Sequence, residues 1–132
     1  MTVTIKKTAS TGSAENFISF LNSRLEECGC SDEKARRALD TAADEILSNI
    51  IDYAYPGSDC GEIEMSCEIS AGSAEVTFKD SGTPFNPLEH IPSGEISENG
   101  GYGIMLTRAL MDDVSYTFSE GQNCLTIIKK WI

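Results

Sequence analysis

The chain is 132 residues long, the length of one domain, and 40% of its residues are apolar, which is enough for one ordinary core. Its 21 acidic and 10 basic side chains give a formal net charge of -11, which excludes the extended basic surface that direct DNA or RNA binding requires. No run of about 18 apolar residues occurs, so we expect no membrane span and a cytoplasmic location. With this charge, a polyphosphate ligand should arrive with a divalent cation, and a protein partner should be basic.

The five cysteines are odd in number and contain no Cys-x-x-Cys pair, which argues against a disulfide framework and against a zinc knuckle. We therefore expect reduced thiols. Cys28 and Cys30 form the one close pair, and a redox or metal role for it stays open as an alternative. The single histidine, His90, is expected to be a solvated loop residue.

The N-terminal half predicts a short strand followed by two helices. Residues 3–5 alternate apolar with polar side chains like a strand, and a turn at residues 11–13 leads into a helical pattern that Gly29 ends. Ser31 is expected to cap the second helix. Its apolar residues recur every three or four positions until the Pro-Gly pair at 56–57, where we expect the helix to end.

The middle of the chain predicts an antiparallel hairpin followed by a long loop. Residues 62–69 and 74–78 alternate apolar with polar residues, and the short segment 70–73 between them suits a turn. The second strand delivers Asp80 at its end. Residues 81 to about 100 hold three of the four prolines and little periodicity, which favours a functional lid.

The last third of the chain returns to regular patterns. Helical spacing recurs over residues 102–110, and residues 114–118 and 125–131 predict a closing hairpin around 120–123. With strands and helices in this order, we expect residues 1–132 to form a single α+β domain. We expect its architecture to be a two-layer sandwich in which helices cover one face of a mostly antiparallel, mixed sheet.

Two side chains of the second predicted helix suit nucleotide chemistry. Glu45 and Asn49 lie at positions i and i+4, so they share one helix face about 5 to 6 Å apart at Cβ. A glutamate accepts a proton from water or a hydroxyl group, and the Asn49 oxygen is a neutral ligand suited to Mg²⁺. The alternative is a solvated helix flank, but an asparagine in mid-helix beside an apolar stripe is unusual there.

A second motif follows the predicted hairpin. Asp80 at the end of a strand can accept a hydrogen bond from an exocyclic amine such as that of adenine, and Gly82 would permit close approach of the flat base. The alternative is a simple turn, which Asp-Ser-Gly readily forms.

A third motif is a glycine cluster just before the last predicted helix. The amides around Gly100, Gly101 and Gly103 can cradle phosphates at a helix N-terminus. The spacing fits neither the dinucleotide-binding fingerprint nor the P-loop.

Together, the three motifs resemble a known family. Glu45-x-x-x-Asn49, Asp80-x-Gly82 and Gly101-x-Gly103 resemble the N, G1 and G2 boxes of the GHKL ATP-binding fold, also called the Bergerat fold, with an ATP lid at about residues 83–100. The short chain, the run from Glu45 to Tyr55 and the segment from Asp80 to Pro87 look like bacterial anti-sigma factors of the serine-protein kinase type.

The resemblance implies a role for each matching residue. In order along the chain it implies a general base at Glu45, a Mg²⁺ ligand at Asn49, an adenine anchor at Asp80, a base-proximal glycine at Gly82, a phosphate-binding hinge at Gly101 and Gly103, and a hydroxyl near adenine at Thr126. It also implies ATP and Mg²⁺ as cofactors, and a sigma factor and a STAS-type antagonist protein as alternative partners. A homodimer is a further expectation from the family.

The sequence departs from the family pattern at three places. Thr83-Pro84 replaces a second glycine of the G1 box, and Tyr53 stands where a histidine is common. Residues 94–99 offer no arginine to a terminal phosphate, so the sequence supports nucleotide binding better than fast transfer. Two alternatives to a kinase therefore stay open. One is a non-catalytic nucleotide-binding module that works by partner exchange, and the other is an α+β domain without a nucleotide.

Overall fold

The described part of the chain contains five strands and three α-helices. The computed structural model describes residues 2–10, 12–55, 61–90 and 101–131. The strands are β1 (Thr2–Thr8), β2 (Glu62–Ser70), β3 (Ser73–Asp80), β4 (Asp113–Ser119) and β5 (Gln122–Lys130). The helices are α1 (Ser13–Glu27), α2 (Glu33–Asn49) and α3 (Gly101–Leu110), with a π-helical segment η1 (Ile50–Ala54) directly after α2 and a 3₁₀ turn η2 (Pro87–His90).

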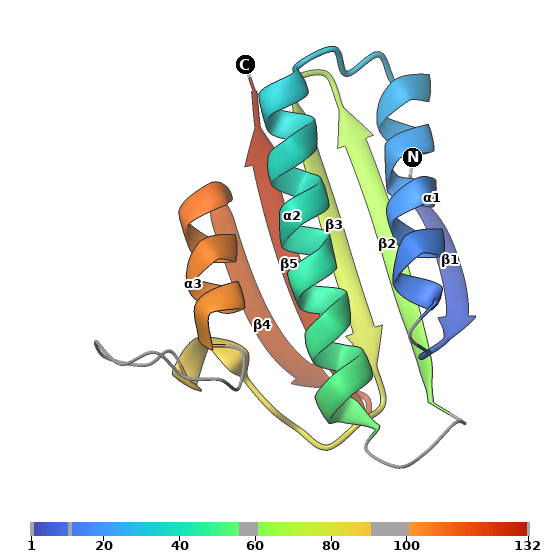
Figure 1. Cartoon of the computed structure of the whole chain (residues 1–132), viewed down its shortest axis with the longest axis vertical. Coiled ribbons are helices and arrows are strands. Elements are labelled where there is room, and N and C mark those ends of the chain that lie inside the picture. Colours follow the sequence, from blue (N-terminus) through green and yellow to red (C-terminus); the bar gives the residue numbers. More distant parts are fainter. Residues whose placement is uncertain (1, 11, 56–60, 91–100, 132) are drawn as a thin grey trace.

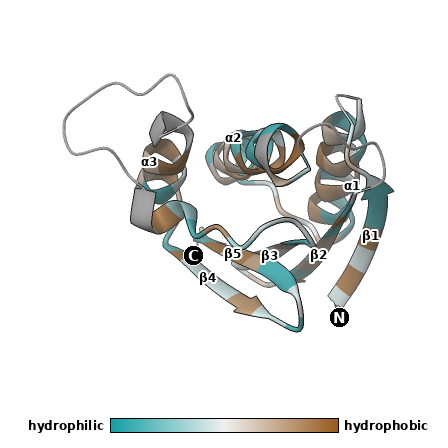
Figure 2. Cartoon of the chain, turned by 90° about the horizontal axis from the view of Figure 1, so that it is seen from below, coloured by the Kyte–Doolittle hydropathy of each residue, from teal (hydrophilic) through white to brown (hydrophobic). Residues whose placement is uncertain are grey.

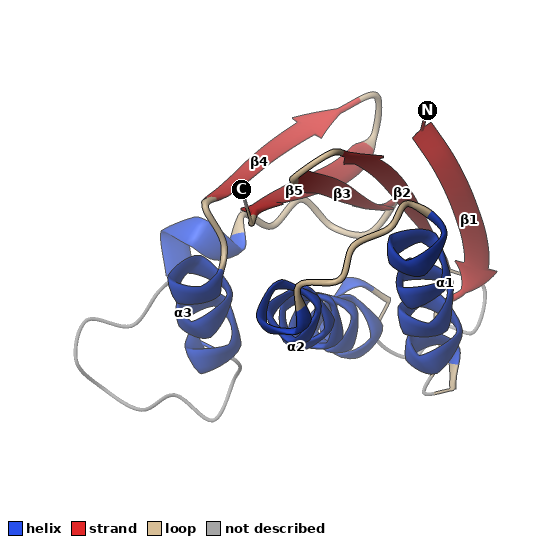
Figure 3. Cartoon of the chain, turned by 90° about the horizontal axis from the view of Figure 1, so that it is seen from above, coloured by secondary structure: helices blue, strands red, loops and turns tan. Residues whose placement is uncertain are grey.

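The five strands form one sheet in the order β1-β2-β3-β5-β4 (Figure 1). Every neighbouring pair within the described residues is antiparallel, so the expectation of a mixed sheet is wrong. All three helices lie on one side of the sheet, with α2 between α1 and α3 (Figures 2 and 3). This arrangement confirms the expected two-layer α+β sandwich.

The core lies between the sheet and the helix layer. Period-two alternation turns one face of β2, β3 and β5 inward, and the 3.6-residue period does the same for one stripe of α1 and α2. Buried side chains from both layers meet there; they include Phe17, Leu21, Leu39, Ile46, Ile63, Met65, Val76, Phe78 and Ile127. The alternation continues to the ends of the strands, which places polar residues on the same inward face.

The ends of α2 differ from the expectation. Asp32, not Ser31, is the N-cap, because its carboxylate accepts a hydrogen bond from the Ala35 amide at 2.9 Å. At the other end α2 stops at Asn49 and continues as η1 to Ala54. The expected end at residues 56–57 lies outside the described residues.

Both hairpin turns are tighter than the sequence indicated. The β2–β3 connection consists of residues 71–72 alone, and the β4–β5 connection consists of Glu120 and Gly121. Glu120 and Gly121 have φ values of 55° and 77°, as a two-residue turn that matches the twist of the strands requires. The segment 122–123, expected in the turn, therefore begins β5.

The described cysteines, Cys28, Cys30, Cys67 and Cys124, carry free thiols, as expected. Burial raises the pKa of Cys67 to about 11, although the Arg24 guanidinium acts in the opposite direction. No helix in the described part of the chain is both long enough and apolar enough to cross a bilayer.

Candidate functional site

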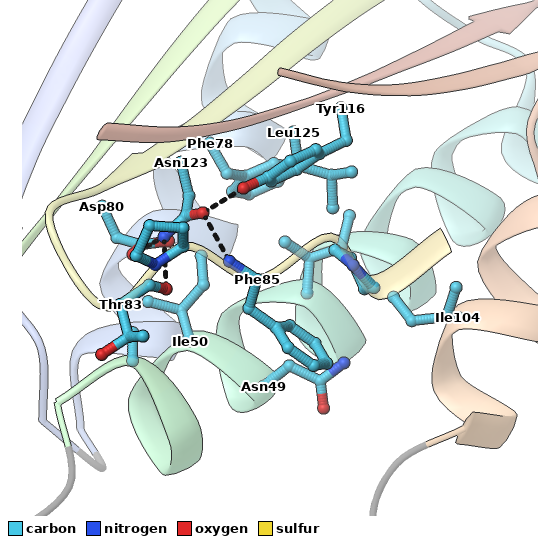
Figure 4. A pocket seen from close by; sticks show the side chains of 14 residues that line it. Asn49, Ile50, Phe78, Asp80, Thr83, Phe85, Ile104, Tyr116, Asn123 and Leu125 are labelled. Carbon is cyan, nitrogen blue, oxygen red and sulfur yellow. Dashed lines mark hydrogen bonds between the residues drawn. The ribbon is translucent and has the colours of Figure 1, made fainter. Parts of the chain in front are cut away.

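A cavity of about 260 Å³ lies between the C-terminal end of α2 and the inner face of the sheet (Figure 4). Its walls are mostly apolar and come from α2, η1, β3, α3, β4 and β5; they include Ile46, Ile50, Phe78, Ile104, Tyr116 and Leu125. Among the described lining residues, Asn49, Asp80, Thr83 and Asn123 carry polar side chains, and Tyr116 adds a hydroxyl group. Apolar walls with a few placed polar groups are typical of sites for small organic ligands.

Asp80 reaches the cavity because it continues the inward alternation of Val76 and Phe78 along β3. Its side chain is buried, with 5% exposed. The Oδ1 atom accepts hydrogen bonds from the Gly82 amide and from Asn123 Nδ2, each at 3.0 Å. Among the described residues no group donates to Oδ2, so this oxygen is available to a ligand.

Asn49 ends α2 and lines the same cavity as Asp80, although the two residues are far apart in the sequence. It is half-buried, with its side chain among the sticks around the cavity in Figure 4. Glu45 lies one helical turn earlier and is also half-buried, but it is not one of the described cavity-lining residues. The structure therefore brings the N and G1 motifs together through Asn49 and Asp80.

Gly82 is held against the end of η1. A Cβ atom at this position would lie 2.5 Å from the Ala54 carbonyl oxygen and 2.7 Å from the Ala54 Cβ, so only glycine fits. The neighbouring Tyr55 hydroxyl donates to the Glu62 carbonyl at 2.9 Å and accepts from the Ser81 amide at 2.6 Å. Ala54 thus approaches Gly82 closely, and the bonds of Tyr55 tie the end of η1 to the ends of β2 and β3. The approach of a base to Gly82 stays a prediction.

The glycine cluster lies at the start of α3 rather than in front of it. Gly101 begins the helix and Gly103 belongs to its first turn, while Gly100 is outside the described residues. The next residue, Ile104, is buried and lines the cavity, so the N-terminal turn of α3 borders it. Of the expected lid, residues 91–100 are also outside the described part, and residues 83–85 and 87 line the cavity.

Thr126 does not reach the cavity. It alternates with the buried residues Leu125 and Ile127 on β5, so it lies on the outer face of the sheet. There its Oγ1 is 3.0 Å from Thr77 Oγ1 on the neighbouring strand. We therefore leave Thr126 out of the candidate site.

Comparison with known proteins identifies the family. Residues 8–129 match the family described as the histidine kinase-like ATPase domain. The chain belongs to this family. A serine-protein kinase RsbW of Listeria monocytogenes is 34% identical over 92 residues, which are 63% of this chain and 59% of the relative. The serine/threonine-protein kinase BtrW of Bordetella bronchiseptica is 26% identical over 99 residues, 71% of this chain and 70% of that protein.

The chain thus spans about three fifths of the length of the Listeria relative. Among solved structures, the RsbU and RsbW domains of Rv1364c from Mycobacterium tuberculosis match with a TM-score of 0.73 and 16% identity. The match covers 99% of this chain and 32% of the other. At this identity it shows the fold, and it agrees with the sandwich expected from the sequence.

Asn123 is the cavity residue that the sequence analysis missed. It lies on β5 directly opposite Asp80, is 7% exposed, and bonds to Asp80 and to residues of the segment that follows. The sequence carries a signal for it, since Asn123 stands two positions before Leu125 and four before Ile127, on the inward face. A polar side chain at an inward strand position needs partners, and these partners mark a built polar network.

Proposed function

We propose that the chain binds Mg-ATP and transfers the γ-phosphoryl group to a serine or threonine of a STAS-type antagonist protein. We propose further that it binds a sigma factor, so that it alternates between two partners in a cytoplasmic regulatory circuit. The observation that carries the proposal is that Asn49 and Asp80, from two distant motifs, line one cavity together with Ile104 at the start of α3. The relatives named serine-protein kinases support the same activity.

The cavity suits the base and sugar of a nucleotide. Its volume of about 260 Å³ is near the lower end of the roughly 300–1,000 Å³ of small-molecule sites. Apolar walls at Phe78 and Leu125 would contact the faces of the base, and Asp80 Oδ2 would accept the exocyclic amine. The phosphates would then extend toward the first turn of α3, where backbone amides and the helix dipole favour anions.

On the α2 side of the cavity, Asn49 is a suitable protein ligand for Mg²⁺. In the described part of the chain no group of three or more histidine, cysteine and acidic side chains is arranged to hold a metal ion. Mg²⁺ does not need such a group, since it typically binds one or two protein oxygens and takes its other ligands from water and phosphate. Asn49 would supply the protein oxygen, and the ion would neutralise phosphate charge during transfer.

Glu45 would serve as the base that accepts the proton of the attacking hydroxyl. It is on α2 one turn before Asn49, so both side chains act from the same helix face. The net charge of -11 favours a basic protein partner over an acidic one.

One observation favours a second candidate function, a nucleotide-binding module that exchanges partners without catalysis. Glu45 lies outside the cavity lining among the described residues, and residues 94–99 contain no arginine for the terminal phosphate. Such a module would keep Asn49 and Asp80 for binding but would transfer no phosphoryl group.

The test is incubation of the chain with γ-labelled Mg-ATP and a STAS-domain antagonist, with Mg-ATP affinity measured in parallel. A kinase labels the antagonist, and Glu45→Gln lowers transfer by about 100-fold or more, while Mg-ATP affinity changes little. Asp44→Asn is the matched control, because it removes a neighbouring exposed carboxylate of the same helix and should leave transfer unchanged. Binding without transfer supports the exchange module, and the absence of binding rules out both functions.

A further inference from the structure

The Asn123 carboxamide connects three parts of the cavity wall (Figure 4). Its Nδ2 atom donates to Asp80 Oδ1 at 3.0 Å and to the Thr83 carbonyl at 3.1 Å. Its Oδ1 atom accepts from the Phe85 amide at 3.0 Å and from the Tyr116 hydroxyl. One buried side chain thus links the end of β3, the segment after it and β4.

Two backbone groups fix the orientation of this carboxamide. The Phe85 amide can only donate, so it must face the oxygen of Asn123, and the Thr83 carbonyl can only accept, so it must face the nitrogen. A flipped carboxamide would place two donors together and two acceptors together. The group that faces Asp80 is therefore an N–H donor.

This orientation determines which oxygen of Asp80 a ligand meets. With the Gly82 amide and Asn123 Nδ2 both on Oδ1, the carboxylate cannot rotate without losing two hydrogen bonds. Oδ2 is left as an acceptor at the cavity wall. A fixed acceptor selects ligands with a donor at the facing position, because a ligand without one leaves a buried polar atom unpaired.

We propose that Asn123 is the positioning residue that sets the preference of the cavity for adenine, by fixing the Asp80 carboxylate so that Oδ2 accepts the exocyclic amine. This inference rests on the proposed binding of ATP and adds the residue that gives it base selectivity. Because Asn123 also holds Thr83 and Phe85, the residue that aims the base anchor also positions the first part of the lid.

The test compares the affinity of ATP with that of purine riboside triphosphate, which is ATP without the exocyclic amine. The wild-type chain should prefer ATP by at least about tenfold, as expected for a hydrogen bond to a charged group. Asn123→Ala should lower ATP affinity to near the level of the analogue, and analogue affinity should stay within about threefold of wild type. Asn123→Thr should retain most of the ATP preference, since its hydroxyl can still donate to Asp80.

Two controls separate a change in the position of the Asp80 carboxylate from a general loss of structure. Gln122→Ala removes the neighbouring amide side chain, which lies on the outer face of the sheet and donates to Ser81 Oγ at 3.4 Å, and it should change neither affinity. In an Asp80→Asn background, Asn123→Ala should have little further effect on the preference, because both residues act through one carboxylate. If Asn123→Ala does not fold, Asn123→Leu replaces it, since leucine has a similar size and no donor.

The measurements distinguish a failure of the proposed ATP binding from a failure of the role assigned to Asn123. If the wild-type chain binds neither nucleotide, the proposed function fails. If it binds ATP with the expected preference but the Asn123 variants weaken both nucleotides equally, or weaken neither, the inference about Asn123 is overturned while ATP binding stands. A folded Asn123→Thr variant that loses the preference also overturns it, because the donor to Asp80 would then not be the deciding feature.

Discussion

Gly82→Ala should destabilise the protein and weaken its nucleotide site together. The added Cβ would lie 2.5 Å from the Ala54 carbonyl oxygen, 2.7 Å from the Ala54 Cβ and 2.9 Å from the Ala54 Cα. Two of these three atoms are backbone, so no side-chain rotation relieves the overlap. The backbone of η1 is also held in place, because the next residue, Tyr55, bonds to both Glu62 and Ser81.

The expected loss in free energy of unfolding for Gly82→Ala follows from overpacking. Forcing one methyl group into a packed contact of this kind costs about 1–3 kcal/mol. For a chain of this length, 1 kcal/mol corresponds to about 4 °C in Tm, so Tm should fall by about 4–12 °C. A displaced Gly82 amide would also lose its hydrogen bond to Asp80 Oδ1, so Mg-ATP affinity should fall by about tenfold.

Differential scanning calorimetry and titration of Mg-ATP measure both effects. Gly12→Ala is the matched control, because a Cβ there meets no atom within 4 Å and its φ of -86° suits alanine. This control should stay within about 1 kcal/mol of wild type and should bind Mg-ATP normally. A Gly82→Ala protein with a wild-type Tm would refute the packing argument.

Three further predictions concern other parts of the chain. Burial raises the pKa of Asp40 above its ordinary value, although a hydrogen bond from Asn22 and the charge of Arg36 act in the opposite direction. The folded protein therefore loses stability as pH rises from the ordinary pKa of an aspartate to the raised pKa of Asp40, because the buried carboxyl group must ionise. Asp40→Asn should therefore raise the free energy of unfolding in urea at pH 7, with no gain at about pH 3, and an equal gain at both pH values would contradict this cause. Thr126→Val should leave Mg-ATP affinity within about twofold and cost about 1 kcal/mol of stability for its lost hydroxyl pair; a large loss of affinity would place it in the site after all. A thiol reagent at neutral pH should label the exposed Cys28 but label Cys67 only after unfolding, since Cys67 is buried and has a raised pKa; early labelling of Cys67 would contradict its burial.

Patterns of short period predicted the elements of the fold well. The alternation in residues 62–69 and 74–78 predicted β2 and β3 to within two residues of their observed ends. The position of Asp80 at the end of a strand was predicted from the same alternation. The meeting of Asn49 and Asp80 was not, because no local pattern says which distant segments pack together; here it came from the resemblance of three motifs to a family.

The part of the site on β5 was not predicted, because the turn before it was placed wrongly. Gln and Asn at 122–123 look like turn residues, while the observed turn uses Glu120 with a positive φ, which few glutamates adopt. In a strand, side chains point alternately to the two faces. The residue at which β5 begins therefore decides whether Asn123 is a turn residue or an inward-facing strand residue. The apolar residues 125 and 127 set this alternation, and it places Asn123 inward and Thr126 outward.

Asn49 at the end of α2 and Asp80 at the end of β3 are proposed to bind opposite ends of one nucleotide, Asn49 the Mg²⁺ and phosphates and Asp80 the base. Titration of adenosine and of Mg-ATP into wild type, Asp80→Asn and Asn49→Ala tests this proposal most directly. We predict that Asp80→Asn weakens both ligands by about tenfold or more, whereas Asn49→Ala weakens Mg-ATP and leaves adenosine unchanged. Wild-type affinity for Mg-ATP in both variants, or a loss of adenosine binding in Asn49→Ala alone, would contradict the account.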